Sequence, residues 1–312
     1  MFSYFESLKS HIFLNAIKCG LSVAVFCFCM SGYGRPQNGG DRASWNRMDI
    51  PLSEIVYTSA DSAQIVSWLS ESFTGNDVLH YARKFIDRPY VGKTLECADP
   101  EKLIVNLREL DCTTLVETVC ALALTKRQKS DKFADYCKNL EFLRYWGGKR
   151  DSYCSRLHYF TWWMHDNVHK NIFEEVTDST VCTSSMVVRN SYMSQFPERY
   201  PMLKNHPERV KIILDLERKY NGHDGYYLPE QKAGWGKSRL GFIQDGDVIA
   251  IVTKKPGLDY SHLGFAVWGK DGKLHLLNAS SLKKKVIEDS MTLRDYLVRQ
   301  KSALGIRLLR LK

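Results

Sequence analysis

The chain has 312 residues, of which 44% are hydrophobic and 25% are charged, and its formal net charge is +9 at pH 7. This composition is that of a globular protein with one large domain or two small ones, and the lack of fixed-period repeats argues against a solenoid or a propeller. A moderate positive charge suits an anionic partner. The sequence has no zinc-finger, basic-zipper or RNP motif, so we do not expect that partner to be nucleic acid.

The first 34 residues have the parts of a secretory signal. Lys9 and Lys18 precede an apolar run over 21–30, and small residues follow at a place where a signal peptidase can cut. We therefore predict a signal peptide over 1–34, export across the inner membrane to the periplasm, and no integral membrane span in the mature protein. The alternative is an uncleaved segment that tethers the protein to the membrane, although the run is short for a span.

The next segment, 35–60, is polar and rich in glycine, and we predict a flexible lead. Two helical patterns follow. Asp61 can cap the first of them, and Asn76 or Asp77 can cap the second, which ends before Pro89.

A longer helix begins at Cys112. Asp111 is a favourable N-cap, and the apolar residues behind it predict one buried helical face: Leu115, Val116, Val119 and Leu122. The segment over 127–240 is mixed, with helix patterns at 157–168 and 207–220. We interpret it as an elaboration inserted into a single domain that covers 61–312.

The last third of the sequence is typical of antiparallel strands. Four short runs have the composition of strands: 248–252, 263–268, 274–277 and 306–311. We predict a helix capped by Ser290 before the last of them. A turn over 269–272 joins two of them. A helix that carries a cysteine, followed by antiparallel strands that carry a histidine, predicts an α+β fold.

Cys112 is the candidate nucleophile. At the first turn of a helix, free backbone N–H groups and the helix dipole favour an anion, so we expect the pKa of the thiol to be lowered. The same N–H groups would stabilise a tetrahedral oxyanion. From its position alone, Cys112 is equally explained as a small buried residue at a helix start.

His262, at the start of a strand, is the candidate acid and base for the leaving amine. Its ring needs an orienting partner, and the next strand offers His275 and Asn278. These two residues are three positions apart and point to opposite faces, so only one of them can serve. If the hairpin centres on Lys270, Asn278 lies directly opposite His262, and we prefer it.

Nine cysteines are present, three of them within the predicted signal peptide. The other six include no C-x-x-C pair, which argues against a structural zinc site, and their spacing assigns no disulfide.

Five segments together resemble the NlpC-type peptidoglycan cysteine peptidases, a papain-like superfamily. They occur in that family's order: Pro-Tyr-Val-Gly at 89–92, Asp-Cys-Thr-Thr at 111–114, Gly-Asp at 246–247, Ser-His-Leu-Gly-Phe-Ala-Val at 261–267 and Leu-Asn-Ala-Ser-Ser at 277–281. The resemblance implies a papain-like core in which the cysteine helix packs on an antiparallel sheet bearing the histidine. Asn278 stands where the wider superfamily often has a histidine, and an amide oxygen can also accept the imidazole N–H.

Within this superfamily the sequence is more similar to one branch, the N-acetylmuramoyl-L-alanine amidase-like proteins. Three features carry this resemblance: Glu117 after the cysteine motif, Leu-His-Tyr-Phe at 157–160 before Trp163, and Leu-Asp-Tyr-Ser-His at 258–262. This branch implies hydrolysis of the amide between the lactyl group of N-acetylmuramic acid and L-alanine in muropeptides, including anhydro-muropeptides, without a cofactor. The resemblance also implies that Tyr90 lines the site. Further candidates to meet the substrate are Arg156, His158 and Trp235.

Three alternatives stay open. An endopeptidase that cuts the stem peptide after γ-D-glutamate would use the same catalytic residues. His165 and His169 have the spacing of zinc ligands, but Asp166 follows where a zinc protease needs glutamate, so we predict no metal site. A non-catalytic cell-wall binding protein on the same fold would have no need of Cys112 and His262 together.

Overall fold

The computed structural model describes residues 49–312, so the predicted signal peptide lies outside the described residues. The helices, in chain order, are α1 (Ser59–Ser70), α2 (Asp77–Arg83), α3 (Cys112–Arg127), α4 (Phe133–Arg144), α5 (Phe160–His169), α6 (Tyr192–Gln195), α7 (Pro207–Tyr220), α8 (Lys237–Leu240) and α9 (Leu293–Arg299). None of these helices within 49–312 is long and apolar enough to cross a membrane.

The strands, in chain order, are β1 (Ile55–Val56), β2 (Leu103–Ile104), β3 (Phe173–Glu175), β4 (Ser184–Val187), β5 (Asp224–Pro229), β6 (Val248–Thr253), β7 (Tyr260–Trp268), β8 (Leu274–Ser280), β9 (Lys285–Thr292) and β10 (Ala303–Leu311). The described residues form an antiparallel sheet in the order β4-β5-β10-β6-β7-β8-β9, with β3 also paired to β10. Helices beside an antiparallel sheet confirm the α+β class.

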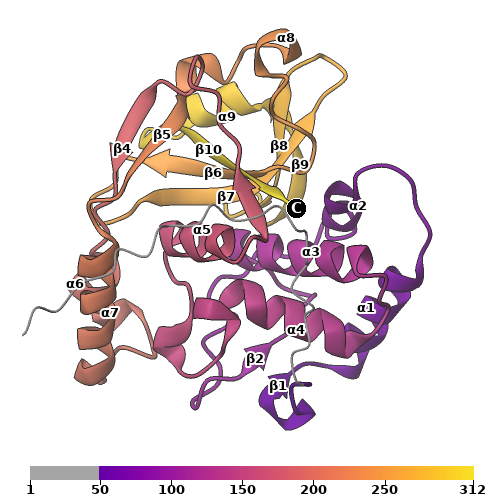
Figure 1. The fold of residues 1–312 in the computed structure, drawn as a ribbon, viewed down its shortest axis with the longest axis vertical. Helices are drawn as coiled ribbons and strands as arrows, with labels where there is room; N and C mark the ends of the chain where they lie inside the picture. The colour runs from indigo at the N-terminus through magenta and orange to yellow at the C-terminus, as the bar shows by residue number, and fades with distance from the viewer. Residues whose placement is uncertain (1–48) are drawn as a thin grey trace, which may run out of the picture. The chain divides into compact units, whose positions relative to one another are not determined.

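Helix α3 is buried on all sides. It contacts β7 and β8, and it also contacts α1, α2 and α4 (Figure 1). Every side chain from Thr114 to Thr125 is buried. The four residues expected on the buried face are therefore buried, and the burial extends to the other faces because protein surrounds the helix.

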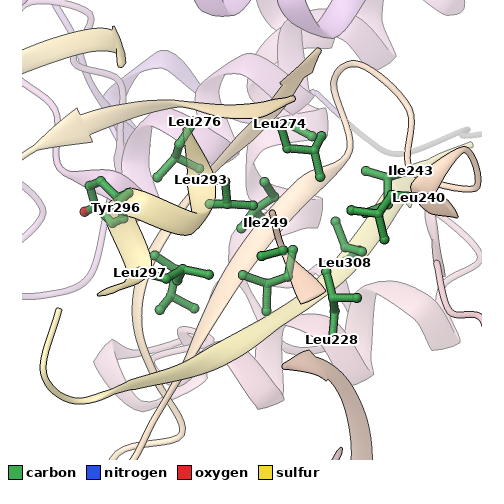
Figure 2. Packing of buried hydrophobic residues seen from close by; sticks show 14 of the residues in the cluster. Leu228, Leu240, Ile243, Ile249, Leu274, Leu276, Leu293, Tyr296, Leu297 and Leu308 are labelled. Carbon is green, nitrogen blue, oxygen red and sulfur yellow. The ribbon is translucent and has the colours of Figure 1, made fainter. Parts of the chain in front are cut away.

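A second core lies where α9 covers the sheet. Leu293 and Leu297 of α9 point toward Ile249 of β6, Leu276 of β8 and Leu308 of β10 (Figure 2). Because side chains alternate across a sheet, these strand residues mark the face that α9 covers.

The structure moves several predicted boundaries. The cap of α1 is Thr58 rather than Asp61. Asp61 is the third residue of the helix, and its side chain completes the capping box with Thr58. Ordered structure begins within the predicted lead, because β1 at Ile55–Val56 pairs with β2. The helix cap expected at Ser290 is at Thr292 instead, because β9 continues through Ser290.

The structure describes six cysteines within 49–312, and none of them forms a disulfide: Cys97, Cys112, Cys120, Cys137, Cys154 and Cys182. Cys97 is the exposed one among these six.

An ion pair is buried against α3. The Arg144 guanidinium donates to the Glu117 carboxylate at 2.6 Å and to the Ile104 carbonyl at 2.8 Å, and both charged side chains are almost fully buried. A buried charge without its partner is costly, so this pair fixes α4 to the helix that carries Cys112.

We expect Arg144→Met to lower the free energy of unfolding by about 3–5 kcal/mol, because Glu117 is left buried and uncompensated. The double variant Glu117→Leu/Arg144→Met should be more stable than the single variant. Urea unfolding measures both. A single variant that loses less than about 1 kcal/mol would contradict this role of the pair.

Candidate active site

Cys112 is the first residue of α3, and a capping box places it there. The Asp111 carboxylate accepts from the Thr114 backbone N–H at 2.8 Å, and the Thr114 hydroxyl accepts from the Asp111 backbone N–H at 2.9 Å. These reciprocal bonds define where the helix begins, so the thiol stands at its open end.

Three donors surround the thiol of Cys112. They are its own backbone N–H, the Thr113 hydroxyl and the backbone N–H of Leu263 on β7. Leu263 directly follows His262, so the strand that carries the imidazole also supplies a donor to the sulfur. Donors held in this way can stabilise negative charge on the sulfur or on an adjacent oxygen.

His262 is held by Asn278. The His262 Nε2 atom lies 2.9 Å from Asn278 Oδ1, and the Asn278 amide nitrogen lies 3.4 Å from the Leu276 carbonyl, which fixes the orientation of the amide. Because Oδ1 only accepts, Nε2 must donate, and Nδ1 is left as the basic nitrogen of the neutral ring. Asn278 is fully buried.

The strand register differs from the predicted one. Ala266 pairs with Leu276 and Phe265 with Leu277, so Gly264 lies opposite Asn278 and His262 lies two residues further along. The hairpin centred on Lys270 is therefore wrong. His262 and Asn278 still share one face, because the shift is an even number of residues, and they meet diagonally across the strands.

Two backbone features make this diagonal contact. The register between β6 and β7 shifts at Ser261, next to His262, and such a bulge turns the neighbouring side chains. Gly264 leaves room for Asn278, since a Cβ atom on Gly264 would lie 3.0 Å from the Asn278 Cβ and 2.6 Å from the Leu277 carbonyl oxygen.

The other candidate partner, His275, lies away from His262. Its ring nitrogens lie 3.1 Å from the Asp289 carbonyl and 3.2 Å from the Asp271 carboxylate, at the hairpin end. The structure therefore brings Asn278, rather than His275, to the imidazole.

Two tyrosines lie near the thiol. Burial raises the pKa of Tyr90 to about 12 and that of Tyr296 to about 12, and the nearby Cys112 adds to both shifts. Tyr296 comes from α9, and its ring lies nearly parallel to the His262 ring with centroids 6.1 Å apart. Sequence reasoning did not select Tyr296, because no spacing rule links α9 to β7.

The pKa values of the central pair differ from our expectation. Burial raises the pKa of the Cys112 thiol to about 12, and the Asp111 charge adds to this, while the surrounding donors act against it. Burial also lowers the pKa of His262, although the hydrogen bond that its Nε2 donates to Asn278 raises this pKa in part. The lowered thiol pKa expected from the helix start is therefore wrong, and the resting pair is a neutral thiol and a neutral imidazole.

A cavity of about 220 Å³ opens over Cys112 and His262. Asp259 is the one carboxylate among the described residues that line it, and it accepts from the backbone N–H groups of Thr161 and Tyr260 and from the Asn190 amide. We call this space the catalytic cavity. Its walls also include the aromatic rings of Tyr159, Phe160 and Tyr260.

The remaining predicted residues fall in different places. His158 lines the catalytic cavity, and its Nε2 donates to the Tyr153 carbonyl at 2.9 Å, while burial lowers its pKa to about 3. Arg156 lines an adjoining cavity and is bound to the Glu101 and Glu96 carboxylates. Trp235 lines neither cavity. It packs on the core under α9.

His165 and His169 belong to no group of three or more potential metal ligands among residues 49–312. Asp166, between them, accepts from the Gly147 N–H and pairs with Lys170 at 2.7 Å. Residues 49–312 contain no group of three or more potential ligands that could hold a metal ion.

The fold and site define an α+β protein with a helix-borne cysteine facing a strand-borne histidine and asparagine. Residues 80–306 match the AmiA-like, N-acetylmuramoyl-L-alanine amidase-like family. The chain belongs to this family.

Solved structures are similar over most of the chain. An N-acetylmuramoyl-L-alanine amidase from Bacteroides uniformis is 40% identical, with a TM-score of 0.71, and the match covers 76% of this chain and 98% of that one. A Bacteroides fragilis protein named as a candidate xylanase is 42% identical, with a TM-score of 0.70, over 75% of this chain and 100% of that one.

A protein from Legionella pneumophila is 21% identical, with a TM-score of 0.61, over 81% of this chain and 93% of that one, which shows a shared fold alone. A comparison with curated proteins finds no match.

The raised thiol pKa gives a testable pH dependence. At pH 9 the thiol, with a pKa of about 12, should remain protonated, so the ultraviolet difference between wild type and Cys112→Ser should show no thiolate. The value of kcat/KM should fall on the acid side only below the ordinary histidine pKa of 6.5, because a lowered His262 pKa keeps the base neutral there. A rise in thiolate absorbance below pH 8 would contradict the neutral thiol and neutral imidazole.

Gly264→Ala should lower kcat by about 10- to 100-fold, because the new methyl group pushes Asn278 out of line with the imidazole. Gly236→Ala is the matched control, since its Cβ atom would meet no neighbour closer than 3.8 Å. Circular dichroism should show both variants folded. Full activity in a folded Gly264→Ala variant would show that the Asn278 position is not critical.

Proposed function

We propose that the protein is a cell-wall amidase that hydrolyses the bond between N-acetylmuramic acid and L-alanine in muropeptides, including anhydro-muropeptides. The observation that carries the proposal is the His262–Asn278 pair beside Cys112 in a chain of the amidase-like family. The 40% identity to a protein named as an amidase supports the same bond specificity. We also propose export through the segment 1–34.

The neutral resting pair leads to a concerted first step. As the Cys112 sulfur attacks the lactyl carbonyl carbon, its proton passes to His262 Nδ1, so the charged nucleophile never accumulates in the buried site. Donors around the sulfur bind the oxyanion. Asn278 accepts from Nε2 and stabilises the orientation of the imidazolium.

The second half of the reaction restores the enzyme. The imidazolium donates its proton to the leaving nitrogen of L-alanine, the C–N bond breaks, and a thioester remains on Cys112. His262 then takes a proton from water, which attacks the thioester and releases the acid, and the thiol regains its proton. The chemistry balances without a cofactor.

Two other activities are weaker candidates. A papain-like endopeptidase of the NlpC type would use the same three residues and differ only in which amide it binds. A glycosidase, as the name of the Bacteroides fragilis protein suggests, needs two carboxylates that flank the bond. Among residues 49–312, the catalytic cavity has only Asp259, which already accepts three hydrogen bonds.

The test is digestion of defined muropeptides by the protein without residues 1–34, with products identified by mass. We expect free peptides that begin with L-alanine, and we expect Cys112→Ala to abolish them. A conservative Cys120→Ala change, in a buried thiol on the same helix, is the matched control and should retain activity. Cleavage within the stem would indicate the endopeptidase, and activity that survives Cys112→Ala would exclude the proposed nucleophile.

A further inference from the structure

Two more cavities adjoin the catalytic cavity. A side cavity of about 180 Å³ shares Thr113, His158 and Tyr200 with it. A larger basic cavity, of about 630 Å³, shares Tyr200 and Lys93 with the side cavity. Tyr200 lines all three, so the cavities lie next to one another around this side chain.

Two residues that line the side cavity carry buried polar atoms that lack hydrogen-bond partners. The hydroxyl of Tyr153, a residue that is 3% exposed, and the Oε2 atom of Glu96 are buried without a hydrogen bond. Buried polar groups are normally satisfied, so these atoms are suited to a ligand that brings both a donor and an acceptor. A peptide amide has both. Arg156 offers no free charge here, because Glu101 and Glu96 bind it.

The basic cavity has an excess of positive charge. Lys93, Arg199 and Lys204 line it, and Glu198 is the one acidic group among its described lining residues. The Lys93 ammonium donates to the Arg199 carbonyl at 3.0 Å, which ties the two cationic residues together. Lys204 is exposed, and no ion pair is found for it within 49–312, whereas the Arg199 guanidinium lies 3.7 Å from the Glu198 carboxylate.

The charge of the lining residues differs between the catalytic cavity and the basic cavity. No lysine or arginine is among the described residues that line the catalytic cavity, and its aromatic walls suit the apolar face of a sugar ring. An anionic portion of the substrate is therefore drawn toward the basic cavity. In a muropeptide, the stem peptide is the portion that carries free carboxylates and successive amides.

We propose that the side and basic cavities bind the stem peptide, and that Lys204 and Arg199 make the enzyme selective for stems whose carboxylates are free rather than amidated. This inference rests on the proposed amidase function and adds a charge preference to it. The sugar then occupies the catalytic cavity on the other side of the scissile amide.

The test compares two muropeptides whose tripeptide stems differ only in having free or amidated carboxylates. We expect the wild type to have the higher kcat/KM on the free stem, with a preference that shrinks as salt is raised. Lys204→Gln and Arg199→Gln should each raise KM for the free stem about two- to fivefold at unchanged kcat, and they should leave the amidated substrate unaffected. The exposed Lys301→Gln, outside these cavities, is the matched control.

Equal kcat/KM on the two stems, or the same loss on both stems in the variants, would overturn the inference and leave the amidase proposal intact. Calorimetry on Cys112→Ala with the released stem tripeptides, free and amidated, measures the charge preference without hydrolysis. Tighter binding of the free tripeptide, lost in Cys112→Ala/Lys204→Gln, supports the inference even if muropeptides are not cleaved. Equal affinity for both tripeptides refutes it.

Discussion

The site depends on the burial of α3 between the sheet and the other helices. A helix whose side chains are buried from Thr114 to Thr125 cannot slide or rotate without exposing apolar groups, and the Glu117–Arg144 pair adds a fixed polar contact. The Asp111 capping box then sets where this rigid helix starts. The thiol of Cys112 is therefore held against the beginning of β7, where the Leu263 backbone N–H points to it and His262 lines the same cavity.

The same burial determines the protonation of the catalytic pair. A helix start favours a thiolate, but desolvation and the adjacent Asp111 charge outweigh the surrounding donors, so burial raises the pKa of Cys112. Because burial also lowers the pKa of His262, neither group is charged at rest. In the proposed mechanism, charge develops only as the sulfur attacks the carbonyl carbon, and Asn278 and the donors around the sulfur stabilise it.

Local signals in the sequence were sufficient for part of this description. Asp111 as a cap, Cys112 as the first helical residue and the strand pattern around His262 all follow from short-range rules, and they led to the correct fold class. Long-range features did not follow. The β7–β8 register was misjudged by a wrong hairpin centre, Tyr296 reaches His262 from a distant helix, and the polar atoms of the side cavity become visible only when separate loops are folded together.

The most direct measurement of the central claim is the mass of the protein after rapid acid quenching during turnover of an anhydro-muropeptide. If Cys112 attacks the lactyl carbonyl, the protein should gain the mass of the sugar-lactyl acyl group. Free stem peptide should appear in at least an equal amount, and proteolysis should locate the adduct on Cys112. Turnover without any adduct, or an adduct on another residue, would contradict the account.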